Sequence, residues 1–387
     1  MSDAGQIPYT LWQLMTYFLR LGALGFGGPV ALVGYMQRDL VDQRGWITEA
    51  DYKEGLALAQ IAPGPMAAQL AIYLGYVHYR LIGATVAGVA FVLPSFVMVV
   101  ALGWAYTSFG GLVWMQAVFY GVGAAVIGIM IISAHKLATK NIGRDNLLQG
   151  IFIVLAAVTA ITQSEIAWLV IAAGVLVWVV RCKPKFGSSS LSAALPMQLP
   201  QWLPLTSDPN TLIQIAVFFT KAGAFVFGSG LAIVPFLYGG VVTEHHWLTD
   251  KQFVDAVAVA MITPGPVVIT TGFIGYLVAG LPGATLAAAA TFVPCYLITV
   301  IAAPHFKKHG KRPGLIAFVD GLTAAAVGAI AGSVVVLAQR SIIDIPTVLL
   351  ASGTTALLWK SKKVPEPVIV AVAALIGLAI YPLMHHI

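Results

Sequence analysis

The sequence predicts an all-α polytopic membrane protein with two inverted homologous repeats, each of about five spanning helices plus one re-entrant Pro-Gly-Pro hairpin. Three observations predict it: an apolar composition, a sequence motif that occurs twice, and the placement of the cations. Of the 387 residues, 59% are hydrophobic and 9% are charged, whereas a soluble domain carries about a quarter charged residues. A chain with so little polar surface must face lipid.

The remaining composition excludes several classes of protein. The net charge of +6 comes from cations in short clusters between apolar runs, as in cytoplasmic loops. Nucleic-acid binders instead carry basic stripes interleaved with aromatic residues. Two cysteines, Cys182 and Cys295, are too few for a disulfide framework or a cysteine metal cluster. The first apolar run, residues 9–36, is too long for the apolar core of a signal peptide, so we expect it to be retained.

The chain contains the same motif twice. Arg20 aligns with Lys221, and the alignment continues without a gap until Pro65 aligns with Pro266. The identical pairs include Gly22/Gly223, Phe26/Phe227, Gly27/Gly228, Trp46/Trp247, Thr48/Thr249 and both Pro-Gly-Pro tripeptides. Shared hydrophobicity would not align tryptophan, threonine and Pro-Gly-Pro at one offset, so the chain is a duplication. We expect an N-terminal membrane repeat at 1–182, a cytoplasmic linker at 183–209 and a C-terminal membrane repeat at 210–387.

The loops predict the topology. The apolar stretches run approximately over 10–37, 54–79, 82–107, 113–135, 146–162, 165–181, 211–242, 253–280, 283–304, 314–339, 342–359 and 366–384. The positive-inside rule puts the cation clusters between them in the cytoplasm. Lys53 and Arg80 then lie on one side, so 54–79, with Pro-Gly-Pro at its centre, is interpreted as a re-entrant hairpin. Its twin, 253–280, enters from outside. Each half then crosses the membrane five times. Because this number is odd, the second repeat is inverted relative to the first, and the N-terminus is placed outside. The alternative to the hairpins is a pair of kinked spanning helices.

Two kinds of break interrupt the apolar runs and form the candidate substrate site. One lies at residues 25–29 and again at 227–230, and the other at 62–65 and again at 263–266. A half-helix that begins inside the membrane presents free N–H groups and a partial positive charge, which suit an anion. The alternative is that the glycines only permit close packing and the prolines only kink. The candidate residues are Gly27, Gly28, Pro29, Gln60, Pro63, Gly64, Pro65, Gly228, Ser229, Gly230, Thr263, Pro264, Gly265 and Pro266.

Charged residues inside the apolar runs are the other candidates. Arg20 and Lys221 occupy corresponding places in the two halves. They are interpreted as cations that attract the anion into two vestibules, Arg20 at the outer one and Lys221 at the inner one. The alternative is that each side chain snorkels to the membrane interface. Glu54, Asp255 and Asp320 are candidates for a proton relay. For Glu54 and Asp255 the alternative is a first-turn acid that favours the helix dipole.

No metal, cofactor or enzymatic site is expected. The eight histidines lie mostly at segment ends, and their spacing does not suit zinc. The sequence has no P-loop, no nucleophile elbow and no dinucleotide-binding glycine pattern. A membrane enzyme would need a cluster of titratable groups at depth, and a scaffold would not need duplicated broken helices. A transporter is therefore the expected function, with enzyme and scaffold as remote alternatives.

The broken motifs resemble those of the chromate ion transporter family, in its bidomain long-chain form. The matching segments are FLRLGALGFGGP, RGWIT and LALAQIAPGP in the first half, and GAFVFGSG, HWLTDKQF and ITPGP in the second. The resemblance implies a multi-pass protein of the bacterial inner membrane that exports chromate and confers resistance. Family members often have histidine after Ala31, where this chain has Leu32, which bears on selectivity between chromate and sulfate.

Other partners and directions of transport stay open at this point. Besides the lipid bilayer, the expected partner is chromate or sulfate, and a homodimer is a further expectation. Two negative charges leaving a cell at 100 mV gain about 4.6 kcal/mol, so export needs no coupled ion. Uptake or exchange of sulfate or another tetrahedral oxyanion is the alternative function.

Overall fold

The computed structural model describes residues 8–26, 28–109, 113–162, 167–182, 211–225, 227–228, 230, 233–309, 312–361, 364 and 366–384. The described chain is helical except for one pair of two-residue strands and short connections. The elements of the first half are α1 (Leu11–Leu24), α2 (Gly28–Met36), η1 (Gln37–Gln43), α3 (Glu49–Ile61), β1 (Gly64–Pro65), α4 (Met66–Phe109), α5 (Val113–Asn141), α6 (Asn146–Thr162) and α7 (Ala167–Cys182).

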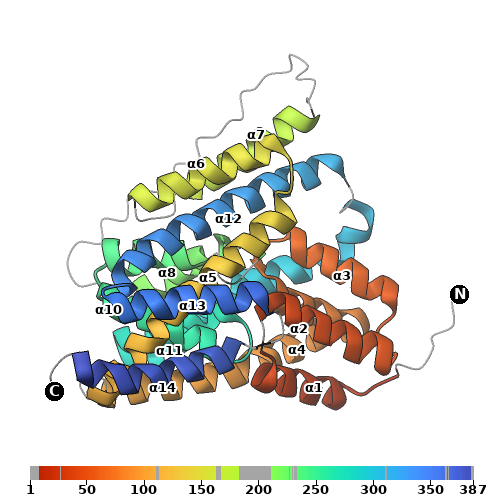
Figure 1. Ribbon diagram of the computed structural model, residues 1–387. Coiled ribbons are helices and arrows are strands. Elements are labelled where there is room, and N and C mark those ends of the chain that lie inside the picture. The colour runs from red at the N-terminus through yellow and green to blue at the C-terminus, as the bar shows by residue number, and fades with distance from the viewer. Residues whose placement is uncertain are drawn as a thin grey trace, which may run out of the picture.

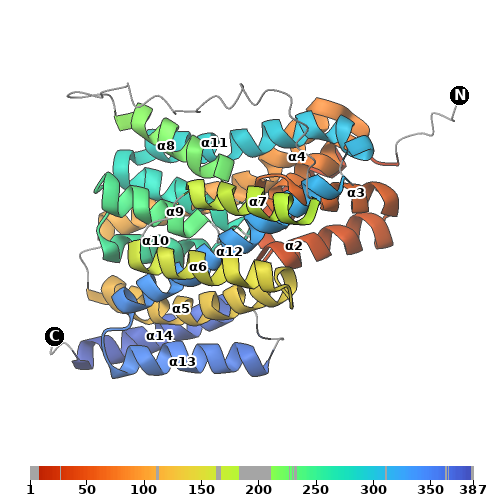
Figure 2. The ribbon, with the colours of Figure 1, turned by 90° about the horizontal axis from the view of Figure 1, so that it is seen from above.

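The second half repeats this order. Its elements are α8 (Thr211–Phe225), β2 (Phe227–Gly228), α9 (Ile233–Tyr238), η3 (Gly239–Glu244), α10 (Asp250–Ile262), η4 (Val267–Ile269), α11 (Thr270–His309), α12 (Pro313–Ser341), α13 (Ile345–Lys360) and α14 (Glu366–Met384). The predicted linker, 183–209, lies outside the described residues. Figure 1 shows α1, α2 and α3 gathered at one end of the molecule and α8 and α10 at the other, and Figure 2 shows the same separation from above.

The first apolar run is a hairpin rather than a spanning helix. The ring of Tyr9, which precedes α1, stacks on Trp46, which follows η1, with 4.9 Å between the ring centroids. The guanidinium of Arg44 lies over the rings of Tyr17 and Trp46. The chain therefore enters and leaves at the same end and reverses at the glycine break after Gly25.

This geometry corrects the predicted crossing over 10–37 and the predicted outer N-terminus. Hydropathy does not distinguish one long helix from two antiparallel short ones, because both give an apolar run of the same length. The start of α1 lies beside the cation-rich turn that contains Arg44, so a topology that separates the two by a membrane is excluded.

The Pro-Gly-Pro segment forms a second hairpin beside the first. Arg80 interrupts α4 with a φ of 51° and divides it into a short arm, 66–79, and a long arm, 81–109. The short arm folds back on α3, where Gly55 lies against the ring of Tyr73. At its end the Tyr79 hydroxyl donates to the Tyr9 carbonyl oxygen. Both hairpins of the first half therefore begin and end at one end of the bundle.

The duplicated Trp-x-Thr motif has a structural explanation. Thr48 and Thr249 are the N-cap residues of α3 and α10, and their hydroxyl oxygens accept from the N–H groups of Asp51 and Gln252. Caps of this kind satisfy donors that the first helical turn leaves free. Trp46 and Trp247 stack on aromatic residues of α1's N-terminal side and of α8. The motif thus fixes the turn between the two hairpins in both halves.

Four longer helices follow the hairpins in each half within the described residues. In the first half they are the long arm of α4, α5, α6 and α7; in the second they are residues 281–309 of α11, α12, α13 and α14. Five helical segments are long and apolar enough to cross a membrane: Met66–Phe109, Val113–Asn141, Val267–Pro304, Pro313–Ser341 and Glu366–Met384. The prediction of five crossings and one hairpin per half is thus replaced by four long helices and two hairpins.

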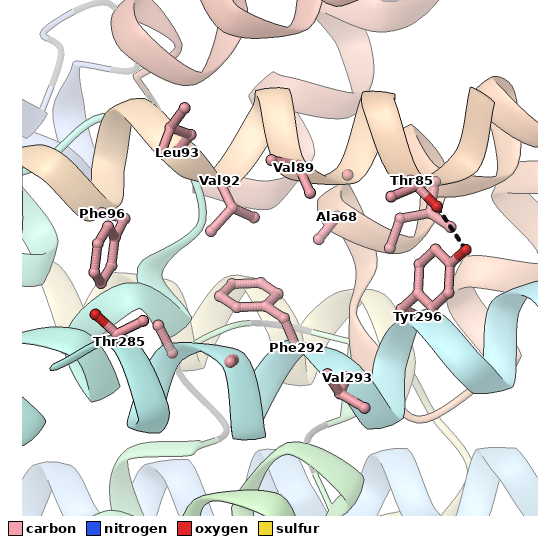
Figure 3. A pocket seen from close by; sticks show the side chains of 14 residues that line it. Ala68, Thr85, Val89, Val92, Leu93, Phe96, Thr285, Phe292, Val293 and Tyr296 are labelled. Carbon is pink, nitrogen blue, oxygen red and sulfur yellow. Dashed lines mark hydrogen bonds between the residues drawn. The ribbon is translucent and has the colours of Figure 1, made fainter. Parts of the chain in front are cut away.

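The halves meet along two corresponding helices that run in opposite directions. The long arm of α4 crosses residues 281–309 of α11, the long arm of α11. Thr85 and Tyr296 share a hydrogen bond of 2.8 Å at one end of the crossing, and Figure 3 shows Phe96 near Thr285 at the other end. Figure 3 shows the apolar groove between the arms, with Val92 facing Phe292. Corresponding positions line it from both sides, as an approximate two-fold axis requires.

Candidate functional site

The breaks of one half meet the breaks of the other. Gly64–Pro65 pairs in parallel with Phe227–Gly228 as strands β1 and β2. On the other side of the pseudo-two-fold axis, the Gly265 N–H donates to the Gly25 carbonyl oxygen at 2.9 Å. Each Pro-Gly-Pro break is therefore bonded to the first-run break of the opposite half. The structure thus brings the two predicted kinds of break together.

The central glycines of the Pro-Gly-Pro breaks cannot carry a side chain without movement. Gly64 has a φ of +140° and Gly265 a φ of +95°, conformations that L-residues with a Cβ rarely adopt. A methyl group on Gly265 would lie 2.0 Å from Ser95 Oγ, and one on Gly64 would lie 2.7 Å from Gln69 Nε2. Conformation and space both require glycine at these two positions.

Three buried side chains hold the breaks in place. Ser95, on the long arm of α4, donates to the Pro264 carbonyl oxygen at 2.7 Å, so it binds a break of the other half. Gln69 Nε2 donates to the Pro63 carbonyl oxygen at 2.8 Å. Cys295 corresponds to Ser95 and lies against Gly64. Sequence reasoning missed Ser95 and Cys295, although both follow the duplicated prolines Pro94 and Pro294.

The half-helices start within about one residue of the predicted prolines. α2 starts at Gly28 with Pro29 second, α4 starts just after Pro65, and Pro266 is the N-cap of η4. The Thr263 hydroxyl, a predicted anion donor, instead donates to the Val259 carbonyl oxygen at 2.7 Å. Gly230 is buried, and Gly27 and Ser229 lie outside the described residues.

A cleft of about 400 Å³ leads to the breaks. Pro29 and Met66, in the first turns of two half-helices, line it together with Gln60. Lys140 and Asp320 supply charge to it, and other lining residues are Ala57, Ile61, Leu137, Asn141, Ile316, Val319, Thr323, Ala326, Val327 and Ile330. Sequence reasoning assigned Lys140 only to a cytoplasmic cation cluster, because its approach to the breaks depends on how α5 packs.

The three candidate relay acids lie in different surroundings. Glu54 is half-buried on α3, beside Tyr73. Asp320, in the cleft, is bonded to Arg181, which also contacts Asp145 at 2.7 Å. Asp255 is 4% exposed and accepts a hydrogen bond of 2.8 Å from the Tyr106 hydroxyl. It lines a second cavity, at the opposite end from the turn that contains Arg44.

Arg20 and Lys221 lie on the hairpins but outside this central group. Both side chains are exposed, on α1 and α8. The first hairpin begins and ends beside Arg44, so Arg20 belongs to the cation-rich end of the bundle and Lys221 to the other. The predicted sides of Arg20 and Lys221 depended on an N-terminus placed outside.

The apolar groove at the pseudo-two-fold axis is not suited to an anion. Its lining is apolar apart from Thr85, Thr285 and Tyr296, and Figure 3 shows the first and last of these bonded to each other. A dianion transferred there would lose hydration without compensating donors. The cleft at the breaks is the better candidate.

Comparison with known proteins identifies relatives that cover nearly the whole chain. The chain is 72% identical over 381 residues to the chromate transport protein of Cupriavidus metallidurans, covering 98% of this chain and 95% of that one. It is 61% identical to the probable chromate transport protein of Synechococcus elongatus, with 95% of each chain covered. It is 30% identical to the chromate transport protein of Pseudomonas aeruginosa, covering 98% of this chain and 95% of that one.

No solved structure matches the chain significantly. The profile of the chromate transporter family matches it twice, over residues 12–178 and 213–378. These two segments are the halves whose breaks meet at the candidate site, and the long apolar helices around them are those of a multi-pass membrane protein. The chain belongs to the chromate transporter family.

Proposed function

We propose that this protein exports chromate across the inner membrane of a bacterium and thereby confers chromate resistance. The observation that carries the proposal is the meeting of the four breaks at β1–β2 and at the Gly265–Gly25 hydrogen bond. Half-helix N-termini that converge from two halves supply N–H donors and positive dipole ends to one place, as an oxyanion requires. Relatives named as chromate transport proteins support chromate as that oxyanion.

The proposed topology follows from the charges at the two ends of the bundle. The long arm of α4 leaves the end that contains Arg80, and α5 returns to it with Lys140. α7 ends there too, because Arg181 contacts Asp145, which precedes α6. At the opposite end, the cations Lys251 and Arg340 lie among acids such as Asp250. The positive-inside rule therefore makes the first end cytoplasmic.

In this topology the two halves are inverted repeats whose hairpins are re-entrant and enter from opposite faces. Such repeats with broken helices recur among secondary transporters. In this topology α7 ends in the cytoplasm and α8 begins outside.

The cleft gives this proposal a direction of entry. It extends from Lys140, at the cytoplasmic end of α5, to Pro29 and Met66 at the breaks. A chromate dianion would be drawn by Lys140 and then bound by backbone donors, as an inward-facing transporter requires. Leaving the cell at 100 mV contributes about 4.6 kcal/mol for two charges, equal to more than about a thousandfold in concentration.

The test is radiolabelled chromate flux in inverted membrane vesicles and in proteoliposomes with an imposed potential. Uptake into inverted vesicles should rise with an inside-positive potential, and sulfate should compete weakly. A matched variant, Lys140→Gln, should raise the concentration of chromate needed for half-maximal flux. Flux of sulfate without flux of chromate would replace the proposed substrate, and absence of both fluxes in well-inserted protein would refute the function.

A further inference from the structure

The second cavity, of about 370 Å³, lies at the proposed non-cytoplasmic end, and no step described so far uses it. It is lined by residues of α10, α5, α12 and α14. The titratable and charged groups that face it are Asp250, Lys251 and Asp255 of α10, Tyr120 of α5, Arg340 of α12 and Tyr381 of α14, with Gln116 and Ser341 as further polar residues. From the long arm of α4, Tyr106 also reaches Asp255.

The two carboxylates of this cavity differ in their partners. Asp250 contacts Arg340 at 3.0 Å and accepts from the Tyr238 hydroxyl. Asp255 is 4% exposed, and no cationic nitrogen of the described residues lies within 4.0 Å of it. Lys251 acts on Asp255 only through space. An ionised carboxylate that is buried without a paired cation is costly, and binding a proton removes that cost.

The ligand that suits Asp255 is a proton rather than a metal ion. One Asp255 oxygen accepts from Tyr106, and the carboxylate borders the cavity. Calcium and similar hard cations take six or more oxygen ligands, and no group of three acidic, histidine or cysteine side chains suited to a metal occurs in the described chain. A single carboxylate with one phenol is sufficient for a proton.

The long arm of α4 connects Asp255 to the breaks. This arm makes two side-chain hydrogen bonds to the second-half hairpin, from Tyr106 to Asp255 and from Ser95 to the Pro264 carbonyl oxygen. α10 runs without interruption from Asp250 to Ile262, just before that break. Tyr106 donates to an ionised carboxylate more strongly than to a neutral one. Protonation of Asp255 therefore weakens one of these two hydrogen bonds between the hairpin and the arm.

We infer that Asp255 is a proton-binding site loaded from the non-cytoplasmic cavity, and that its proton is exchanged for the exported oxyanion. This rests on the proposed function. In the exchange, a hydronium ion in the cavity gives its proton to the Asp255 carboxylate and becomes water, and the hairpin loosens from the arm. The proton is later released to the cytoplasm as the carboxylate ionises again. One proton exchanged per anion adds about tenfold to the attainable anion gradient for each unit of pH difference.

The experiment follows chromate and protons separately in proteoliposomes. Radiolabelled chromate reports anion flux, an entrapped pH dye reports protons, and potassium with valinomycin clamps the voltage. At about pH 8 chromate itself carries no proton, so proton movement reports exchange alone. In the wild type, chromate leaving one side should be matched by protons entering from the other. Asp255→Asn should abolish this proton movement and make chromate flux independent of the outer pH.

Matched variants keep the test decisive. Asp255→Glu keeps a titratable group and should keep proton movement, while Asp250→Asn, in the same cavity but paired with Arg340, should keep it too. Tyr106→Phe should retain exchange and shift the outer pH at which flux is half-maximal. Chromate flux without protons in the wild type, or protons carried by Asp255→Asn, would overturn the inference and leave chromate transport intact. Absence of wild-type chromate flux would instead refute the proposed function.

Discussion

Replacing Gly265 by alanine adds one methyl group at the centre of the candidate site. The methyl would lie 2.0 Å from Ser95 Oγ and 3.3 Å from the Gly22 carbonyl oxygen. Ser95 would have to move and give up its 2.7 Å hydrogen bond to the Pro264 carbonyl oxygen. The Gly265 backbone, with a φ of +95°, would also be held in a conformation that alanine disfavours.

These two effects set the expected magnitude. A non-glycine residue in such a backbone region costs about 1–3 kcal/mol, and a lost buried hydrogen bond costs about 1 kcal/mol more. The sum, about 2–4 kcal/mol, applies to the geometry on which anion binding depends. We therefore expect Gly265→Ala to lower chromate flux by about thirtyfold or more, while most protein still inserts and folds.

Gly280 provides the matched control. It has a φ of +62° at the turn within α11, and a methyl there meets no atom within 4 Å. Gly280→Ala should lower the melting temperature slightly and leave flux near wild type. The assay is initial chromate uptake by inverted vesicles, normalised to inserted protein and accompanied by thermal unfolding in detergent. Wild-type flux in Gly265→Ala, or an equal loss in Gly280→Ala, would refute the reasoning.

Three further predictions test other parts of the structure. Single cysteines at Asp51 and Tyr79, in a background without Cys182 and Cys295, should label with an impermeant reagent from the cytoplasmic side. A single cysteine at Glu244 should label from the other side. Labelling of Asp51 and Tyr79 from opposite sides would exclude the Pro-Gly-Pro hairpin of the first half. Arg20→Gln should raise the apparent KM for chromate on the cytoplasmic face, and Lys221→Gln should raise it on the outer face. Both effects should be larger at low salt, because salt screens the attraction between the cation and the anion. Equal effects on both faces would exclude a role for these cations in attracting the anion to separate entrances. Arg181 lowers the pKa of Asp145. This pair therefore stabilises the fold above the unfolded pKa of about 3.9, and the contribution is lost as pH falls through the lower folded pKa. In Arg181→Gln the melting temperature should fall less steeply on acidification, and the same dependence of melting temperature on pH as in the wild type would contradict this.

The duplication and the breaks could be predicted from the sequence because their signals are local. Pro-Gly-Pro and the glycines before Pro29 interrupt apolar runs wherever the chain folds, and the second copy repeats them at a constant offset. The positive φ of Gly64 and Gly265 agrees with the expected turns. The position of the half-helix starts was predicted to within about one residue for the same reason.

The first hairpin and the pairing of the breaks could not be predicted in this way. The contacts that close the hairpin, Tyr9 with Trp46 and Tyr79 with Tyr9, join residues far apart in the chain. The pairing of Gly64 with Phe227 joins different halves. Neither contact produces a periodic pattern in the sequence. The side assigned to Arg20 rested on a count of crossings, which depends on how each preceding segment is interpreted.

The bonds between β1 and β2 and between Gly265 and Gly25 have an evolutionary consequence. After a gene duplication one copy is usually free to diverge, but here each copy forms backbone hydrogen bonds with the breaks of the other at the candidate site. A substitution at Gly64 affects its paired segment at Phe227. The sequences of the two copies must therefore co-vary, as those of the subunits of an obligate heterodimer do. Fusion into one chain keeps their ratio at one to one, and selection then acts on the pair rather than on either copy.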